Sequence, residues 1–171
     1  MIAIFLLAAL SATFLFAGCS SVTGARAISG SDGSIVLSGT VSDGKADVTV
    51  RLKENCGINK MVLILDYDTT ALTLTGMEQK DALRSMSLIT TNPYTEEGYG
   101  ITPFSFDYQN VVSKDSSTGV MFVLHFSVKK NAKVSRTAVG LTYEEGAILT
   151  LDGGKTLKRS FSVTPALLQL R

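Results

Sequence analysis

The sequence has few of the side chains on which catalytic and metal chemistry depends. Its 171 residues include no tryptophan, one histidine and two cysteines. There are 16 Lys and Arg against 15 Asp and Glu, which leaves a net charge of +1. A nucleic-acid partner requires a basic excess gathered on one face, so this balance argues against nucleic acid as the main partner. The shortage of reactive side chains argues against an enzyme, a cofactor and a resident metal.

Charge is also absent from the N-terminal segment, where Arg26 is the first charged residue. Residues 1–17 form a nearly unbroken apolar run, which is short for a membrane span and typical of a secretory signal. The run ends in Leu15-Phe16-Ala17-Gly18-Cys19, which resembles a bacterial lipobox, where small residues precede a cysteine that receives a lipid. We therefore expect a lipoprotein-type signal peptide over 1–18 and lipidation of Cys19. The resulting location is extracellular, lipid-anchored to the bacterial cell membrane or cell surface. A plain secreted protein and an uncleaved anchor stay open as alternatives.

The cleaved chain would keep only one other cysteine, Cys56. With Cys19 lipidated, an internal disulfide is impossible, and we interpret Cys56 as a semi-buried thiol beside a turn at Gly57 rather than a nucleophile. Residues 19–32 are rich in Ser, Gly and Ala, which predicts a flexible tether.

From Gly33 onward the pattern predicts strands. Residues 46–52 alternate between apolar and polar side chains, as a half-buried strand does, and Met61 to Tyr67 is an almost continuous apolar run, as in a central strand. Asp152-Gly153-Gly154 is a tight-hairpin signal. Only Lys80 to Leu88 and Lys129 to Ser135 could be helical, each for a turn or two. The remaining expected strands cover 34–38, 71–77, 104–108, 120–128, 138–143, 147–151 and 157–163. Eight or nine short strands without a long helix predict an all-β sandwich or barrel.

The strand over 120–128 has an unusual second face. By alternation, Phe122, Leu124, Phe126 and Val128 share one face, and Met121, Val123, His125 and Ser127 share the other. Large apolar side chains on an outward face rimmed with polar groups indicate an interaction site. The alternative interpretation is that a helix or loop covers that face.

Several segments, in this order, resemble the cohesin module, the dockerin-binding domain of cellulosome scaffoldins. They are Val48-Thr49-Val50-Arg51-Leu52, Gly57-Ile58, Leu65-Asp66-Tyr67-Asp68 with Leu72, Phe104-Ser105-Phe106, and the run from Gly119 to Lys129 followed by Asn131-Ala132. The likeness covers about Gly33 to Leu168, so we expect one cohesin-like β-sandwich domain over 33–168.

The resemblance implies a nine-stranded jelly-roll sandwich that binds a dockerin on one sheet face, through alternate residues of the third, fifth and sixth strands. By alternation, those residues would be Lys60, Val62, Ile64 and Asp66, then Ser105 and Asp107, then Met121, Val123 and His125. Calcium is expected on the dockerin and not on this chain, which we expect to be a monomer.

The sequence thus supports three hypotheses. The first is a non-catalytic cell-surface anchor that binds a dockerin of a carbohydrate-active enzyme or scaffoldin. The second is a carbohydrate-binding sandwich, for which Tyr94 and Tyr99 are the candidate aromatic side chains. The third is a structural surface lipoprotein with a cohesin-like fold and no dockerin partner.

Overall fold

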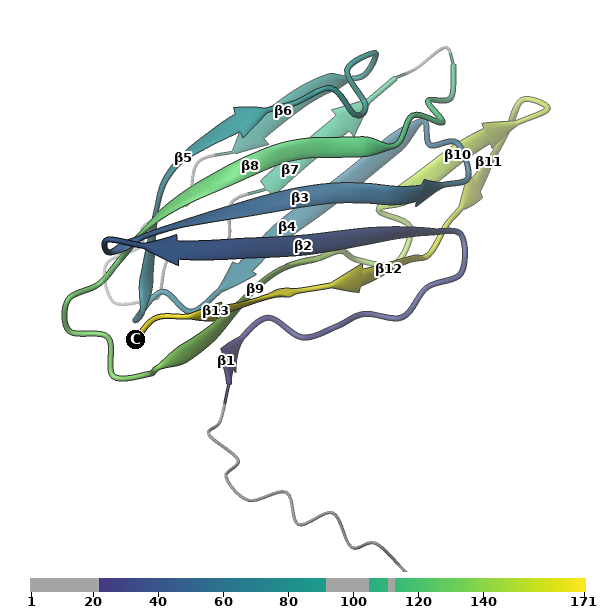
Figure 1. The fold of residues 1–171 in the computed structure, drawn as a ribbon. Helices are drawn as coiled ribbons and strands as arrows, with labels where there is room; N and C mark the ends of the chain where they lie inside the picture. The colour runs from purple at the N-terminus through teal and green to yellow at the C-terminus, as the bar shows by residue number, and fades with distance from the viewer. Residues whose placement is uncertain (1–21, 92–104, 111–112) are drawn as a thin grey trace, which may run out of the picture.

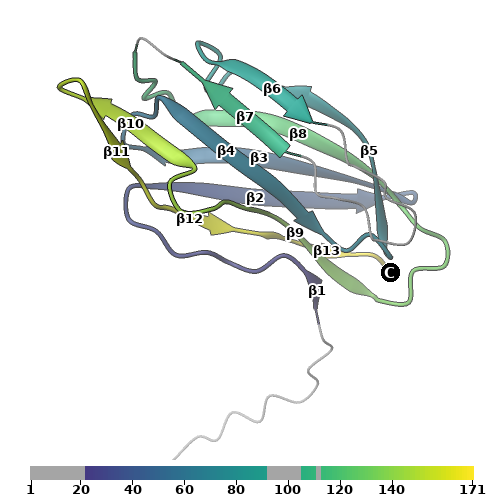
Figure 2. The ribbon, with the colours of Figure 1, turned by 180° about the vertical axis from the view of Figure 1, so that it is seen from behind.

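Two β-sheets packed face to face make up the structure, a computed structural model that describes residues 22–91, 105–110 and 113–171 (Figures 1 and 2). Within these residues there is no helix, and the predicted all-β jelly-roll sandwich is confirmed. None of the described residues forms a helix long and apolar enough to cross a membrane.

Sheet B contains five strands in the order β12-β2-β3-β8-β5. Their bounds are β2 (Gly33–Ser42), β3 (Lys45–Asn55), β5 (Leu72–Gln79), β8 (Gly119–Val128) and β12 (Phe161–Thr164). The β2–β3 hairpin turns at Asp43 and Gly44, whose φ angles of 50° and 73° suit a tight two-residue turn.

Sheet A contains eight strands, with β4 at its centre between β9 and β10 on one side and β7 on the other. Their bounds are β1 (Thr23–Gly24), β4 (Lys60–Tyr67), β6 (Ser87–Thr91), β7 (Ser105–Gln109), β9 (Arg136–Thr142), β10 (Ile148–Asp152), β11 (Lys155–Lys158) and β13 (Ala166–Gln169). The predicted hairpin at Gly153-Gly154 joins β10 to β11, with Asp152 opposite Lys155.

The described residues form thirteen strands rather than nine. Residues 87–91, at the end of a segment considered as a possible helix, form β6, and the expected strand over 157–163 is divided between β11 and β12. Two short strands, β1 and β13, were not expected. Residues 81–86 and 129–135 form turns instead of helical turns.

The core lies between the sheets and consists of the inward residue of each alternating pair. Leu63 and Leu65 from β4 and Leu124 from β8 are fully buried. The rings of Phe106 and Phe122 stack across the core with centroids 4.3 Å apart. Burial of these apolar side chains supplies most of the driving force for folding.

The segment before β2 lies along the edge of the sandwich, although residues 19–32 were expected to be a flexible tether. Gly24 pairs with Ala138 of β9, and Ile28 exchanges two backbone hydrogen bonds of 2.9 Å with Val163 of β12. Asp32 accepts a 2.8 Å hydrogen bond from the Ser160 backbone N–H. Residues 23–32 therefore form a strap that joins both sheets, because the backbone groups at the sheet edges give even a Ser- and Gly-rich chain hydrogen-bond partners.

Candidate partner-binding face

The four candidates on β4 all lie on the outer side of sheet A. Lys60, Val62, Ile64 and Asp66 are half-buried and alternate with fully buried Met61, Leu63 and Leu65. The sequence pattern predicted this alternation correctly, since side chains along a strand point to opposite sides of a sheet.

The two candidates on β7 lie beside those on β4. Asp107 is directly opposite Val62, and Ser105 is directly opposite Ile64. Residues opposite each other in an antiparallel pair have their Cβ atoms about 5 Å apart, so these four side chains form one patch.

Sequence reasoning missed the neighbours that widen this patch. On β6, Ile89 lies opposite Asp107 and Thr91 lies opposite Ser105, while Thr142 of β9 lies opposite Ile64. Ile89 is one of the few large apolar side chains that are well exposed, with 51% of its surface accessible. The β-branched run Ile89-Thr90-Thr91 was the available signal, but the possible helix over Lys80 to Leu88 ended just before it, and residues 89–91 were assigned to no element.

We call this surface the sheet A face. It consists of Val62, Ile64, Ile89, Thr91, Ser105, Asp107 and Thr142. Lys60 and Asp66 lie at the two ends of the β4 row.

Asp107 is the charged group inside this face. Its Oδ2 accepts a 2.8 Å hydrogen bond from Gln109 Nε2, while its Oδ1 is buried and has no hydrogen-bond partner among the described residues. A buried acceptor without a donor costs stability, so the packing around Asp107, and not a second hydrogen bond, holds this oxygen in place.

The remaining three candidates lie elsewhere, and the prediction of one continuous face from all three strands is wrong. Val123 and His125 lie on β8, which pairs with β3 and β5 in sheet B, and they point away from the core on the opposite side of the sandwich. His125 Nδ1 lies 2.7 Å from Asp47 Oδ1 of β3. Alternation along a strand does not reveal which sheet the strand joins, because sheet membership is set by non-local pairing.

Met121 lies on neither outer surface, because it is fully buried. Val50 of β3 pairs with Phe122, whereas Arg51 pairs with Val120, so Met121 is the extra residue of a β-bulge. A bulge shifts the alternation by one residue, so Met121 points into the core and Val120 points out with Arg51. The prediction that Met121 is presented to a partner is therefore corrected.

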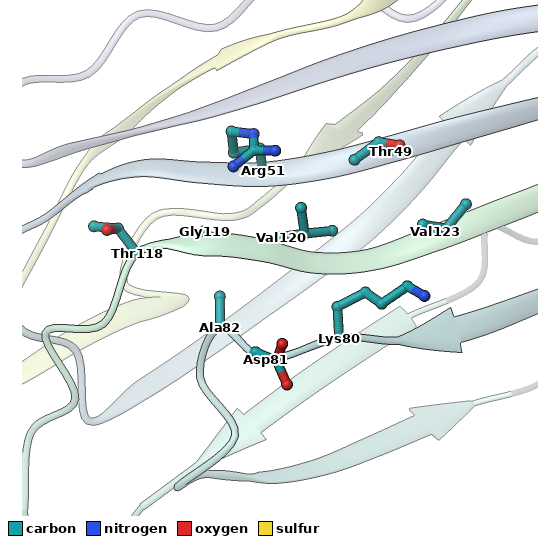
Figure 3. A pocket seen from close by; sticks show the side chains of 9 residues that line it. All are labelled: Thr49, Arg51, Lys80, Asp81, Ala82, Thr118, Gly119, Val120 and Val123. Carbon is teal, nitrogen blue, oxygen red and sulfur yellow. The ribbon is translucent and has the colours of Figure 1, made fainter.

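The outer surface of sheet B is hollowed beside this bulge. This depression has a volume of about 490 Å³, and Val120 and Val123 are among the residues that line it. Figure 3 shows Arg51 from β3 on one side of β8 and Lys80 on the other. The charges around it are largely satisfied locally, because Lys80 pairs with Glu78 and Asp81 pairs with Arg84.

The described residues offer no constellation for metal or nucleophilic chemistry. They contain no group of three or more His, Cys, Asp or Glu side chains that could hold a metal ion. Cys56 is exposed, and partial desolvation raises the pKa of its thiol, which makes it a poor nucleophile. Cys19, Tyr94 and Tyr99 lie outside the described residues.

The architecture is thus a jelly-roll sandwich in which the outward side chains of one sheet face are mostly uncharged and range from half-buried to exposed. No family model and no curated protein matches the sequence. Solved structures do match, and they are cohesins. The seventh type I cohesin of ScaB from Pseudobacteroides cellulosolvens aligns with a TM-score of 0.56 at 20% identity, covering 81% of this chain and 91% of that one. The domain described here is cohesin-like.

Two further cohesins show how widely this fold is shared. The sixth cohesin of scaffoldin B from Acetivibrio cellulolyticus, in complex with a Cel5 dockerin, aligns with a TM-score of 0.57 at 14% identity, covering 82% of this chain and all (100%) of that one. A non-cellulosomal cohesin from Archaeoglobus fulgidus aligns with a TM-score of 0.53 at 16% identity, covering 81% and 91%. At identities of 14% to 20%, these likenesses establish the fold of this domain.

Proposed function

We propose that this chain is a non-catalytic cell-surface module that binds a dockerin domain of a carbohydrate-active enzyme or scaffoldin. The observation that carries the proposal is the sheet A face, where half-buried Val62 and Ile64 and exposed Ile89 form an outward apolar patch on the sheet. A preformed apolar surface of this kind favours binding of another protein, because neither partner has to order a loop.

The cohesin-like fold supports a dockerin as the partner. Cohesins of similar fold from Clostridium thermocellum and Acetivibrio cellulolyticus were solved in complex with dockerins. On this chain, the contact would be formed by the sheet A face, with Lys60 and Asp66 selecting partners by charge at the rim. Calcium would be carried by the dockerin, and the module would be a monomer.

The anchor in this proposal is the lipid on Cys19, supported by the lipobox-like residues that precede it. With a lipid at one end and one binding domain, the protein would hold its partner at the surface of the cell. The side chains that define the sheet A face include no aromatic ring, so nothing in that face favours the alternative of carbohydrate binding.

A capture experiment tests the partner. The lipoprotein is immobilised and exposed to the proteins secreted by its own organism, with and without a calcium chelator, and captured proteins are identified by mass spectrometry. We expect dockerin-bearing proteins to be retained with calcium and lost with the chelator. Retention of no dockerin-bearing protein would overturn the proposal and favour a structural surface lipoprotein.

A further inference from the structure

The N-terminal strap, residues 23–32, approaches the two sheets so closely that two of its positions require glycine. A Cβ atom at Gly24 would lie 2.2 Å from the carbonyl oxygen of Ala138 in β9, and one at Gly30 would lie 2.3 Å from the carbonyl carbon of Phe161 in β12. Gly24 also has a φ of 100°, which other residues rarely adopt. A larger residue at either position would therefore lift the strap or displace a strand.

The sandwich is shaped for the strap in turn. Ala25 is buried, and it lies over Gly140 of β9, where an added Cβ atom would approach the Ala25 Cβ to 2.6 Å. Ile28 packs against the core between the sheets. Close packing from both sides leaves the segment one position. The strap therefore has a specific seat, which runs along the side of the sandwich in both views (Figures 1 and 2).

Both ends of the strap are held by hydrogen bonds. At the first end, β1 pairs with β9. At the last end, the Asp32 carboxylate accepts hydrogen bonds from the Ser160 backbone N–H at 2.8 Å, from the Ser160 hydroxyl at 3.2 Å and from Arg159 Nη1 at 3.3 Å. The chain therefore joins the folded domain at Thr23 and not at Gly33.

This attachment point shortens the link between the domain and the lipid proposed on Cys19. Cys19 precedes Thr23 by four residues, which span at most about 14 Å when fully extended. Cys19 precedes Gly33 by fourteen residues, which without the seat would span up to about 50 Å. Seating the strap therefore removes ten residues from the tether.

We propose that the strap is a spacer of fixed length, which holds the sandwich close to the membrane that contains the Cys19 lipid. This inference rests on the lipid anchor of the proposed function, whereas the seat itself does not. A short link keeps the sheet A face near the cell surface and restricts the volume that it can search, because the reach of a flexible tether grows with its length. The partner would then be captured at the surface and not at a distance from it.

The seat would also protect the link from proteolysis. Arg26 is the first basic residue of the chain, so the first bond that trypsin can cut beyond the lipid is the one between Arg26 and Ala27. The Arg26 side chain is exposed, but backbone hydrogen bonds hold the chain on either side of it, at Ala25 and at Ile28. Cleavage at this bond therefore requires the strap to leave its seat, and the cleavage rate reports how often it does.

Trypsin treatment of the mature lipoprotein in phosphatidylcholine vesicles tests the proposal. Mass spectrometry follows cleavage of the bond between Arg26 and Ala27. A synthetic peptide of residues 20–33 gives the cleavage rate of the same sequence without a seat. We expect the wild-type protein to be cut at least about a hundredfold more slowly than the peptide.

Two double variants sharpen the readout, each compared with its own peptide. Gly24→Val with Gly30→Val should be cut at least about tenfold faster than the wild type, because the strap no longer fits its seat. Ser29→Val with Ser31→Val, at exposed strap positions, is the matched control and should be cut at the wild-type rate. Slow hydrogen exchange at Leu63 in β4 shows that each variant is folded. If the glycine variant does not fold, the wild-type rate decides alone.

Neutron reflectometry on a supported bilayer measures the spacing directly. The wild-type domain should lie directly against the headgroups. Gly24→Val with Gly30→Val should move the centre of the domain outward by about 10 Å, the difference in average length between flexible tethers of fourteen and four residues. The serine control should stay at the wild-type height.

The outcomes separate this inference from the anchor. The mass of the N-terminal fragment shows whether Cys19 carries lipid. If it does and the wild-type protein is cut as fast as the free peptide, or the folded glycine variant is as resistant and as close to the bilayer as the wild type, the inference is wrong and the anchor stands. If Cys19 is unmodified, the anchor is wrong and the spacer with it, whereas dockerin capture still tests the binding function.

Discussion

The outer surfaces of the two sheets have the same alternating pattern but differ in which strands carry apolar side chains. On sheet A, the outward residues of β4 and β6 include Val62, Ile64 and Ile89. On sheet B, the outward residues of β2 and β3 are mainly hydroxyl-bearing or charged, among them Ser38 and Asp47. The inward rows of both sheets are equally apolar. The comparison teaches that the outward side chains of a sheet, which contribute little to the core, determine whether its outer surface suits a protein partner or is simply solvated.

Ion pairs strengthen the contrast. On sheet B, His125 pairs with Asp47 and Lys80 pairs with Glu78, so these charges meet within the chain. On sheet A, one oxygen of Asp107 lacks any hydrogen-bond partner among the described residues. Among the described residues, the carboxylate of Asp107 has no basic side chain as an ion-pair partner, so its charge stays available to a basic group of a partner.

Two valines, one on each surface, provide the sharpest test. Val62→Asp places a carboxylate opposite Asp107 in the centre of the sheet A face, and it should weaken dockerin binding by about a hundredfold or more through lost apolar contact and like-charge repulsion. Val123→Asp makes the same change on sheet B and should leave binding unaltered, as measured by calorimetry. Loss of binding in the Val123 variant alone would reverse the assignment of the faces.

Two substitutions on β8 test whether the β-bulge places Met121 in the core while Val123 stays on the outer surface of sheet B. Met121→Ala should lower the free energy of unfolding by about 2–4 kcal/mol, because it opens a cavity in the core. Val123→Ala, two residues along and half-exposed, should cost less than about 1 kcal/mol. Urea denaturation measures both. Near-wild-type stability of the Met121 variant together with weaker dockerin binding would contradict the buried position.

Acid should weaken the strap at the edge of the sandwich. The Ser160 backbone N–H, with Arg159 beside it, holds the pKa of Asp32 below its ordinary value. A carboxyl with a lowered pKa stabilises the fold above its unfolded-state pKa, and this contribution is lost as the pH falls through the folded-state value. Asp32→Asn should therefore show a flatter loss of stability below about pH 4 than the wild type. Parallel curves from pH 7 to 2.5 would show that Asp32 has no such role.

The smallest effect is expected at the ion pair on sheet B. Asp47 and His125 are well exposed, with 61% and 41% of their side-chain surfaces accessible. Exposed pairs contribute little, so Asp47→Asn combined with His125→Gln should change the free energy of unfolding by less than about 1 kcal/mol. Dockerin affinity should stay unchanged. A tenfold loss of affinity would mean that sheet B takes part in binding.

Much of the fold could be predicted from the sequence because local patterns determine it. The alternation along residues 46–52 and the Gly153-Gly154 turn placed β3 and the β10–β11 hairpin correctly. On β4 and β7, the same alternation placed Val62 and Asp107 on the outer side. Each of these features depends on the strand period of two or on turn residues with positive φ.

The candidate site was predicted only in part, because its remaining features depend on long-range pairing. Val123 was assigned to the face with Val62, yet β8 pairs with β3 and β5. Met121 was assigned by alternation, which the bulge interrupts. Ile89 was missed because residues 89–91 were assigned to no element, since a run this short does not identify a strand by its periodicity. In each case the deciding contact lies with a residue far away in the sequence.

The final segment of the chain has a consequence for the time course of folding. On either side of Pro165, β12 completes sheet B beside β2 and β13 completes sheet A beside β9. Neither sheet can therefore close until almost the last residue is available, and pairing ends so distant in sequence makes folding slow. If the chain is exported as proposed, this delay would keep the polypeptide extended during its passage through the membrane, and the sandwich would close on the far side.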